Sequence, residues 1–329
     1  MATPTLAHGD ASVPIGVGTW AWGNQFLWGY DPAQDAQLQA TFEQAVALGL
    51  RFFDTADSYG TGRLQGRSER LLGRFRQALA PEDQQDLLVA TKLAPFPWRL
   101  GRGGLKRAFE ASRARLGGRL ERVQLHWSTA RYAPWQESPL LDGLADLVNE
   151  GLVASLGLSN FGPRRLRQVH GQLQSRGVRL ASLQVQCSLL APRAIEPGGV
   201  ADVCRELGIQ LIAYSPLALG LLARPPGAVA PPAGGVRRLL FARLSPRIHP
   251  LLELLAEIAR SRQVPQAAVA LNWCRSHGAM PIVGLRTVGQ AQMAAAASRW
   301  SLDGAERQAL DTAARGLPVG MPANPFDSD

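Results

Sequence analysis

Residues 48–60 read LGLRFFDTADSYG, and this stretch has three parts that recur along the chain. Gly49 is suited to end a helix, because glycine adopts the left-handed backbone conformation without a steric cost. The apolar run after it is short and continuous, which is typical of a strand that is buried on both faces. Polar residues from Asp54 to Gly60 then close the unit. The stretch therefore predicts a helix end, a buried strand and a polar loop, in that order.

The same pattern recurs often enough to predict a closed barrel. Four further stretches place a glycine before an apolar run, and three more runs lack the leading glycine. The expected strands lie within residues 12–20, 48–56, 85–92, 122–127, 150–160, 176–186, 207–216 and 277–285. Amphipathic helices are expected at about 35–48, 66–79, 102–116, 137–150, 163–174, 199–207, 262–276 and 287–297. Eight strands that alternate with eight helices predict an α/β fold, a (β/α)8 TIM barrel.

The chain has 329 residues, which is more than the roughly 250 residues typical of such a barrel. We expect a single domain over residues 1–329, with a core at about 12–315 and a C-terminal tail at 316–329. The excess length is expected in extra helices at 247–260 and 303–314 and in a long loop after strand seven, at 216–247. A long loop rich in Pro, Gly and Arg favours an active-site loop over a linker between domains.

A Rossmann domain is the competing fold. Gly16, Gly18 and Ala21 fit the GxGxxA fingerprint of dinucleotide-binding domains, which requires a helix to open at the third small residue. The continuation WGNQFLWGYDP, residues 22–32, is rich in glycine and aromatic residues and ends in proline. It predicts a loop, so we reject the Rossmann interpretation.

Composition narrows the classes of function. The formal net charge is +9, and all of the 35 Lys and Arg residues except Lys92 and Lys106 are arginine. The arginines are scattered over the expected helices among acidic residues, which favours solvated helix faces over a nucleic-acid site. A positive field still favours an anionic ligand.

Two further features bear on the location of the protein. No apolar run is long enough to span a membrane, and the start MATPTLAHGD does not resemble a signal peptide. Cys187, Cys204 and Cys274 lie far apart, which is typical of reduced thiols and predicts neither a disulfide framework nor a metal site. A cytoplasmic protein is expected, as a monomer or a weak homo-oligomer.

Polar residues at the strand ends form the candidate site, because barrels of this type place their chemistry at the carboxyl ends of the strands. Strand two ends at Asp54 with Tyr59 behind it, strand three ends at Lys92 and strand four at His126. A neighbouring ammonium lowers the pKa of a tyrosine, which as a general acid at pH 7 benefits from a fall of about 3 units. A carboxylate keeps the lysine charged, and a histidine opposite can orient a carbonyl group. The four residues predict a set that protonates a carbonyl oxygen.

Each of these residues also has a packing alternative. Asp54 could form a turn, Tyr59 could cover the barrel, Lys92 could extend to solvent and His126 could be a core residue. Four such roles at three consecutive strand ends are less credible than one shared site. Other polar residues at the strand ends are Ser159, Asn160, Gln184, Tyr214, Ser215 and Arg286.

The motifs, in this order and spacing, resemble the aldo-keto reductase superfamily over about residues 12–315. The segments that carry the resemblance are FFDTADSYG, LVATK, QLHW, GLVASLGLSNF, LQVQCSLL, IAYSPLALGLL and GLRTVGQAQ. GVGTWAWGNQFLWGYD and LVATKLAPFPWR resemble the cyanobacterial and plant chloroplast branch. The resemblance implies reduction of aldehydes and ketones by hydride transfer from NADPH. Tyr59 would be the general acid, assisted by Lys92 and Asp54, and His126 would orient the carbonyl group.

The resemblance also implies a cofactor site. Its residues would be Gly18, Thr19, Trp20, Ser159, Asn160, Gln184, Tyr214, Ser215, Leu217, Gly220, Arg286 and Gln290. Among them, Ser159, Asn160 and Gln184 would bind the nicotinamide carboxamide, and Tyr214 would stack on its ring. Arg286 would bind the adenosine 2′-phosphate, and a bidentate contact of this kind favours NADPH over NADH.

The chain departs from the family pattern in three places, one of which is the strand-six motif, where Gln186 and Cys187 stand in the usual QxNYSL pattern. Met293 and Ala294 stand where the family often has a glutamate and an asparagine near the adenine. The lysine common after the strand-seven loop is missing. Arg237 and Arg238 could substitute for it, but the sequence favours solvated loop arginines at both positions.

Trp22, Trp28 and Trp127 are expected to line the substrate pocket, and aromatic walls suit apolar or aromatic carbonyl compounds such as pyridoxal-like aldehydes. A second hypothesis keeps the fold and the cofactor but assigns a redox sensor or regulatory subunit with little turnover. A third is an RNA-associated basic protein, which would show salt-dependent retention on RNA without binding NADPH.

Overall fold

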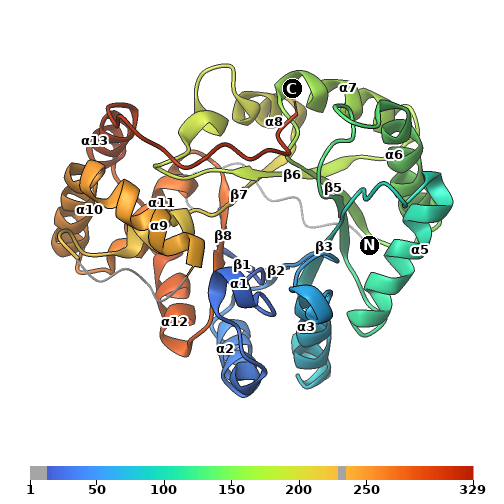
Figure 1. The fold of residues 1–329 in the computed structure, drawn as a ribbon, viewed down its shortest axis with the longest axis horizontal. Helices are drawn as coiled ribbons and strands as arrows, with labels where there is room; N and C mark the ends of the chain where they lie inside the picture. The colour runs from blue at the N-terminus through green and yellow to red at the C-terminus, as the bar shows by residue number, and fades with distance from the viewer. Residues whose placement is uncertain (1–12, 229–234, 329) are drawn as a thin grey trace.

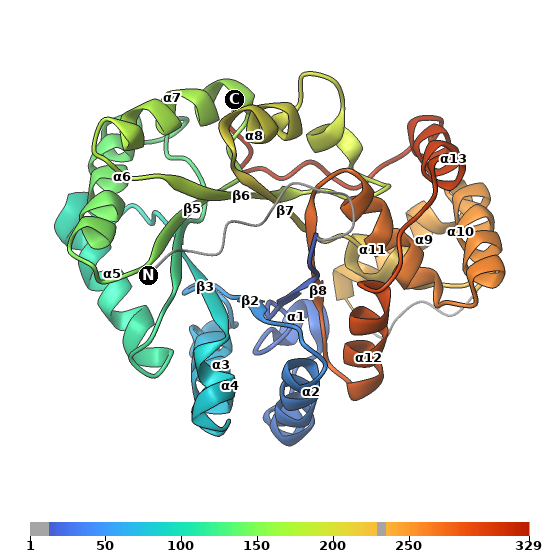
Figure 2. The same cartoon turned by 180° about the vertical axis from the view of Figure 1, so that it is seen from behind.

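The computed structural model describes residues 13–228 and 235–328, and eight parallel strands in it close into one barrel. Each strand pairs with the next along the chain, and β8 returns to β1. The strands are β1 (Gly16–Gly18), β2 (Phe52–Asp54), β3 (Leu88–Leu93), β4 (Arg122–Leu125), β5 (Ser155–Ser159), β6 (Leu180–Gln186), β7 (Gln210–Tyr214) and β8 (Met280–Gly284). Figures 1 and 2 show the helices around the outside of these strands. The predicted TIM barrel is confirmed, and the rejection of a Rossmann domain is correct.

Helices alternate with the strands as expected. They are α2 (Asp35–Ala47), α3 (Arg67–Gln77), α5 (Gly101–Arg115), α6 (Pro134–Asn149), α7 (Pro163–Gln174), α8 (Val200–Leu207), α11 (Gln266–Ser276) and α12 (Val288–Ala297). The extra helices are α10 (His249–Arg262) and α13 (Gly304–Arg315), close to their predicted bounds. Shorter segments are α1 (Gln25–Trp28), α4 (Pro81–Gln85), η1 (Pro32–Gln34), η2 (Gly62–Leu64) and η3 (Pro192–Ile195).

The segment expected as a long loop after β7 contains helices. These are η4 (Ala218–Ala223), α9 (Gly235–Leu244) and η5 (Ser245–Arg247), and residues 229–234 lie outside the described part of the chain. Phe241 and Leu244 of α9 are buried in the main hydrophobic core. Tertiary packing therefore stabilises a helix here, although the Pro- and Gly-rich composition around it predicts a loop.

The glycines that precede five strands have the backbone conformation expected from the sequence. Gly49, Gly151, Gly177, Gly208 and Gly278 have φ values of 88°, 70°, 72°, 65° and 73°. A residue with a Cβ atom rarely adopts this left-handed conformation. These glycines end the helices and turn the chain into the next strand.

Strand alternation divides the barrel interior into an apolar layer and a polar layer. Phe52, Ala90, Ile212, Met280 and Ile282 form a buried cluster of their own. Side chains two positions apart on a strand point to the same side, so the residues two positions after these point inward as well. For three of the strands those residues are Asp54, Lys92 and Tyr214. The apolar layer thus underlies the predicted site at the carboxyl ends.

The C-terminal segment crosses the barrel mouth. In Figure 1 it is the dark red segment that leaves α13 and runs past β7 and β6. Near its end, Ser328 forms a parallel bridge with Phe161, at the end of β5. Among the described residues, none of the helices is long and apolar enough to cross a membrane.

The packing of α3 against the end of α5 generates a test of the fold. A Cβ atom on Gly73 would lie 2.4 Å from the backbone oxygen of Arg115 and 2.9 Å from the backbone of Leu116. Gly73→Ala is therefore expected to lower the free energy of unfolding by about 1–3 kcal/mol, as overpacking does. The control is Gly171→Ala in α7, where a Cβ atom meets nothing within 4 Å and the helix should gain about 0.5–1 kcal/mol. Urea unfolding of both variants measures this, and a stabilised Gly73→Ala variant would contradict the packing.

Candidate active site

Lys92 is the centre of the site. Its side chain is 1% exposed, and its ammonium donates hydrogen bonds to the carboxylate of Asp54, to the Thr55 carbonyl oxygen at 3.0 Å and to the Tyr59 hydroxyl at 3.1 Å. Burial lowers the pKa of Lys92, but Asp54 and Tyr59 raise it by more, so the pKa lies above its usual value. The lysine is therefore an ammonium at neutral pH.

The carboxylate of Asp54 is held from three strands. Besides Lys92 on β3, it accepts hydrogen bonds from the side-chain amides of Gln124 at 3.0 Å and of Gln184 at 2.8 Å. A buried carboxylate needs such donors, because leaving it unpaired away from water is costly. Gln184, which the resemblance assigns to the cofactor, thus also positions Asp54.

Tyr59 is a neutral phenol in this site. Burial raises its pKa, Lys92 lowers it, Asp54 raises it, and the net result is a pKa above the usual value of 10. Burial therefore has a larger effect on this pKa than Lys92 has, whereas the sequence indicated only the effect of the lysine. Lys92 nevertheless acts in the predicted direction, since an ammonium at hydrogen-bond distance stabilises the tyrosinate.

His126 lies beside Tyr59, with the two ring centroids 5.9 Å apart. Its Nδ1 atom lies 3.3 Å from the Ser58 hydroxyl. Burial lowers the pKa of His126 well below its usual value, and Lys92 and Arg99 lower it further. The imidazole is therefore neutral at physiological pH, with one N–H to donate and one nitrogen to accept.

Asn160 connects the ends of β4, β5 and β7. Its side-chain nitrogen donates to the His126 carbonyl oxygen at 3.0 Å and to the Ser159 hydroxyl at 3.1 Å. Its side-chain oxygen accepts a hydrogen bond from the Tyr214 hydroxyl at 3.0 Å. Asn160 has a φ of 62°, a conformation that asparagine tolerates better than most residues and that often marks a functional site.

The C-terminal segment brings residues to this site that the sequence did not indicate. The side-chain nitrogen of Asn324 lies 2.8 Å from the Asn160 side-chain oxygen and 2.6 Å from the Tyr214 hydroxyl. The ring of Phe326 stacks on Trp127 with centroids 4.3 Å apart. Residues 316–329 read as a turn-rich tail, and no pattern in them predicts these contacts.

The segment after β7 has an unusual backbone. Ser215, Ala218 and Leu219 have φ values of 52°, 48° and 60°, and Gly220 has a φ of 96°. Non-glycine residues seldom have positive φ, and such strain clusters at ligand sites. Alternating backbone conformations of this kind can point N–H groups toward an anion. Leu217, the remaining residue expected near the pyrophosphate, lies within the same turn.

Arg237 closes over this turn from α9. Its guanidinium donates to the Leu219 carbonyl oxygen at 2.9 Å and lies 4.2 Å from the ring centroid of Trp28, and Arg286 lies 5.6 Å from the same ring. Burial lowers the pKa of Arg237, and the nearby Arg286 and Arg224 lower it further. Among the described residues, the buried Nε of Arg237 and Nε1 of Trp28 have no hydrogen-bond partner. Two clustered cations and two unsatisfied donors fit an anionic group of a cofactor.

The residues that the resemblance assigns to the adenosine end lie close together in the fold. The backbone N–H of Arg286 donates to the Gln290 side-chain oxygen at 2.7 Å, and its guanidinium donates to the Trp28 carbonyl oxygen at 3.0 Å. Ala294 is fully buried, and Met293 packs against the hydrophobic core. These two residues therefore serve packing rather than a polar contact.

Of the residues that follow β1, Thr19 and Trp22 are buried, whereas Trp20 lies at the barrel mouth near Tyr59. Thr19 is buried and hydrogen-bonds the Asp54 carbonyl oxygen at 3.0 Å, directly after Gly18 at the end of β1. The ring of Trp20 lies 6.4 Å from that of Tyr59. Trp22 is fully buried against Phe75 and donates to a carbonyl oxygen of the β8 end. The expectation that Trp22 lines the substrate pocket is therefore wrong, because the chain turns it into the core.

Aromatic residues form one wall of the mouth. Trp127 lies beside His126, with ring centroids 5.0 Å apart, and meets Phe96 at 6.1 Å. Phe96 stacks in turn on Trp98, which is 71% exposed. Trp127 therefore lies next to a candidate catalytic residue, and Trp28 packs under two arginines. The roles of both tryptophans toward a substrate stay predictions.

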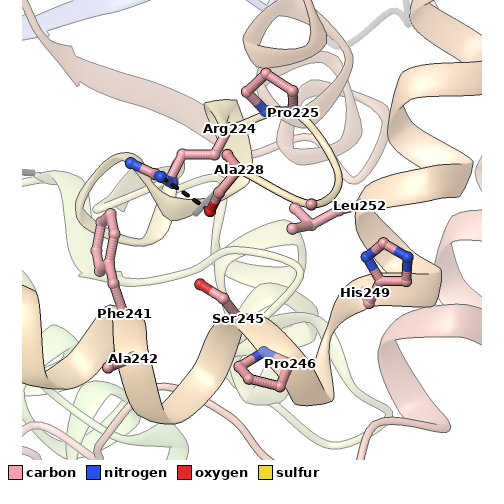
Figure 3. Close-up of a pocket in the computed structure, with 10 residues that line it drawn as sticks. Arg224, Pro225, Ala228, Phe241, Ala242, Ser245, Pro246, His249 and Leu252 are labelled. Atoms are coloured by element: carbon pink, nitrogen blue, oxygen red, sulfur yellow. Dashed lines mark hydrogen bonds between the residues drawn. The ribbon is translucent and has the colours of Figure 1, made fainter. Parts of the chain in front are cut away.

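A separate pocket of about 390 Å³ lies between the segment after η4 and helices α9 and α10. Figure 3 shows Arg224 bonded to the Ala228 carbonyl oxygen on one side and His249 on another. Its lining contains none of the predicted catalytic residues, so the catalytic assignment does not depend on it.

Within residues 13–228 and 235–328, no three His, Cys, Asp or Glu side chains gather in a way that could hold a metal ion. Cys187, Cys204 and Cys274 are free and buried.

Comparison with known proteins places these residues in context. A family model described as the aldo/keto reductase family matches residues 14–315. The chain is 47% identical over 319 residues to the chloroplastic pyridoxal reductase of Arabidopsis thaliana, covering 96% of this chain and 87% of that protein. It is 36% identical over 309 residues to an uncharacterized oxidoreductase of Mycobacterium bovis, covering 92% and 89%. An aldo-keto reductase of Klebsiella pneumoniae, solved in complex with NADPH, matches with a TM-score of 0.71 and 25% identity over 96% of this chain and 94% of that chain.

A buried aspartate next to the site makes stability depend on pH. Asp57 is paired with Arg99 and accepts hydrogen bonds from the Ala94 backbone N–H at 3.2 and 3.4 Å. Burial raises the pKa of Asp57 to about 6, although Arg99 opposes the rise. The folded protein therefore binds this proton more tightly than the unfolded chain, in which the pKa of aspartate is about 3.9. The stabilisation is complete below that value and is lost as the pH rises through about 6.

Asp57→Asn removes this titration. The free energy of unfolding of the wild type minus that of the variant is expected to fall by about 2–3 kcal/mol between pH 4 and pH 7. Urea unfolding of both proteins at four pH values in this window measures the difference, in which other titrating groups cancel. A difference that is constant with pH would show that Asp57 titrates normally.

Proposed function

The chain belongs to the aldo/keto reductase family, and on this premise we propose that it reduces an aromatic or apolar aldehyde with Tyr59 as the proton donor. It is an oxidoreductase that uses NADP(H) as its cofactor. The resemblance seen in the sequence, including that to the plant chloroplast branch, is confirmed by these relationships. The observation that carries the proposed mechanism is the Lys92 ammonium, which bonds both the Asp54 carboxylate and the Tyr59 hydroxyl.

The site supplies the proton for carbonyl reduction. NADPH, when bound, would supply the hydride for the carbonyl carbon. Tyr59 gives its hydroxyl proton to the carbonyl oxygen, and the Lys92 ammonium stabilises the tyrosinate that remains. Asp54 keeps the lysine charged and fixed, since its carboxylate accepts from Lys92 and two glutamines. Neutral His126 can donate a hydrogen bond that orients the carbonyl oxygen.

Cofactor binding is assigned to the opposite side of the mouth. Ser159, Asn160, Gln184 and Tyr214 would hold the nicotinamide end. The positive-φ turn at 215–220 and Arg237 would hold the pyrophosphate, which fits the unsatisfied donors on that side. Arg286 and Gln290 would hold the adenosine end, and Gly18, Thr19 and Trp20 would border the site.

The substrate class rests on the aromatic wall formed by Trp127, Phe96, Trp98 and Phe326. A flat aromatic aldehyde can stack on such a wall and exclude water from the reacting carbon. The 47% identical plant protein is a pyridoxal reductase, which supports pyridoxal-like aldehydes as substrates. The cytoplasmic location, the monomeric or weakly oligomeric state and the absence of a nucleic-acid partner stay predictions.

A redox sensor with little turnover is the second candidate. The same relationship to oxidoreductases argues against it, as does the complete set of Asp54, Tyr59, Lys92 and His126 around one point. A sensor needs to bind the cofactor but does not need a proton donor.

The first test is NADPH oxidation with pyridoxal and 4-nitrobenzaldehyde. Tyr59→Phe is expected to lower kcat by about 10²–10⁴-fold, the range for loss of a general acid, while NADPH still binds. The matched control is Tyr30→Phe, because Tyr30 bonds Asp35 and Arg67 away from the site and its loss should leave kcat within about twofold. NADPH binding without turnover in the wild type on both aldehydes would favour the sensor instead.

The cofactor assignment has its own test. Arg286→Met removes the guanidinium, and charged hydrogen bonds of this kind contribute about 1.5–3 kcal/mol. The Kd for NADPH is therefore expected to rise about 10- to 100-fold, while the Kd for NADH, which lacks the 2′-phosphate, changes little. Titration of both cofactors by fluorescence measures this. An equal rise for both would place Arg286 away from the 2′-phosphate.

A further inference from the structure

A C-terminal strap, residues 317–328, is fixed across the barrel mouth at two points. At one end, the backbone N–H of Met321 donates to the Leu190 carbonyl oxygen at 2.7 Å. At the other end, the backbone N–H of Ser328 donates to the Asn160 carbonyl oxygen at 3.3 Å, and its hydroxyl donates to the same oxygen at 3.3 Å. The strap therefore spans from the end of β6 to the end of β5.

Asn324 points from the middle of the strap into the site. Its side-chain nitrogen donates to the Asn160 side-chain oxygen at 2.8 Å and to the Tyr214 hydroxyl at 2.6 Å. The backbone N–H of Phe326 donates to the Asn324 side-chain oxygen at 3.0 Å. This local hydrogen bond holds the amide with its nitrogen toward the barrel.

The contact leaves Asn160 with no unused hydrogen-bonding group. A primary amide has two N–H donors and an oxygen with two lone pairs. The nitrogen of Asn160 donates to the His126 carbonyl oxygen and the Ser159 hydroxyl, and its oxygen accepts from Tyr214 and Asn324. A ligand amide can therefore bond this side chain only after one of the present partners leaves.

We propose that Asn324 is a self-ligand of the cofactor site, and that NADPH binds after the strap releases Asn160 and Tyr214. The inference rests on the proposed function, which assigns these two residues to the nicotinamide. The side chain of Asn324 and the carboxamide of nicotinamide are both primary amides, so they compete for the same acceptors. The apparent affinity for NADPH is therefore the intrinsic affinity multiplied by the fraction of molecules in which the strap is released.

The direction of the change in affinity separates this proposal from a supporting role for the strap. Asn324→Ala removes the competing amide, and the Kd for NADPH, measured by titration of the full-length protein, is expected to fall about three- to tenfold. The matched control is Ala323→Ser, an exposed neighbour in the same strap, which should bind NADPH as the wild type does. An unchanged Kd for Asn324→Ala would overturn the proposal, because Asn324 would then not compete with NADPH. A higher Kd would also overturn it, because Asn324 would then orient Asn160 and Tyr214 for the cofactor.

Hydrogen exchange supplies a second readout that does not depend on a variant. Saturating NADPH is expected to increase amide exchange within residues 321–328 of the wild type, while exchange in the barrel strands does not rise. Unchanged or slower exchange in the strap would overturn the proposal. A failure of all three proteins to bind NADPH would reject the proposed function and this inference together, whereas tight binding with equal Kd values would reject this inference alone.

Discussion

A lysine ammonium enclosed with an aspartate carboxylate is the constraint on which the site depends. Both side chains are 1% exposed, and breaking such a buried pair typically costs about 3–5 kcal/mol, because the remaining charge loses its partner. The pair must therefore be surrounded by further donors and acceptors. Gln124, Gln184 and the Thr55 carbonyl oxygen fill these roles. The ammonium of Lys92 donates one hydrogen to Asp54 and one to the Thr55 carbonyl oxygen, and its third hydrogen is directed at the Tyr59 hydroxyl.

The pair also explains the electrostatics around it. Lys92 stays charged although burial opposes this, and its charge helps to keep the neighbouring His126 neutral. Tyr59 stays protonated because burial has a larger effect on its pKa than the ammonium does. The resting site thus holds a proton on the phenol and a stabilising cation beside it. This is the arrangement that donation of a proton to an oxygen requires.

The two sides of the mouth differ in chemistry. One side is aromatic, from Phe96 to Trp127 and Phe326, whereas the other collects Arg237 and Arg286 around Trp28. An anionic cofactor and an apolar substrate would therefore approach from different directions. The C-terminal strap contacts the aromatic side through Phe326, and through Asn324 it contacts Asn160 and Tyr214, which are proposed to hold the cofactor.

The sequence by itself determined the barrel and the four strand-end residues, because both follow from local rules. Glycines that take positive φ end the helices before five strands, and strand alternation directs Asp54 and Lys92 inward. Only the tertiary structure decided the net pKa of Tyr59, the burial of Trp22 and the helix α9, since each depends on neighbours distant in the chain. The strap is the clearest case. Asn324 and Asn160 are 164 residues apart, and no local pattern encodes a contact between a turn-rich tail and a strand end.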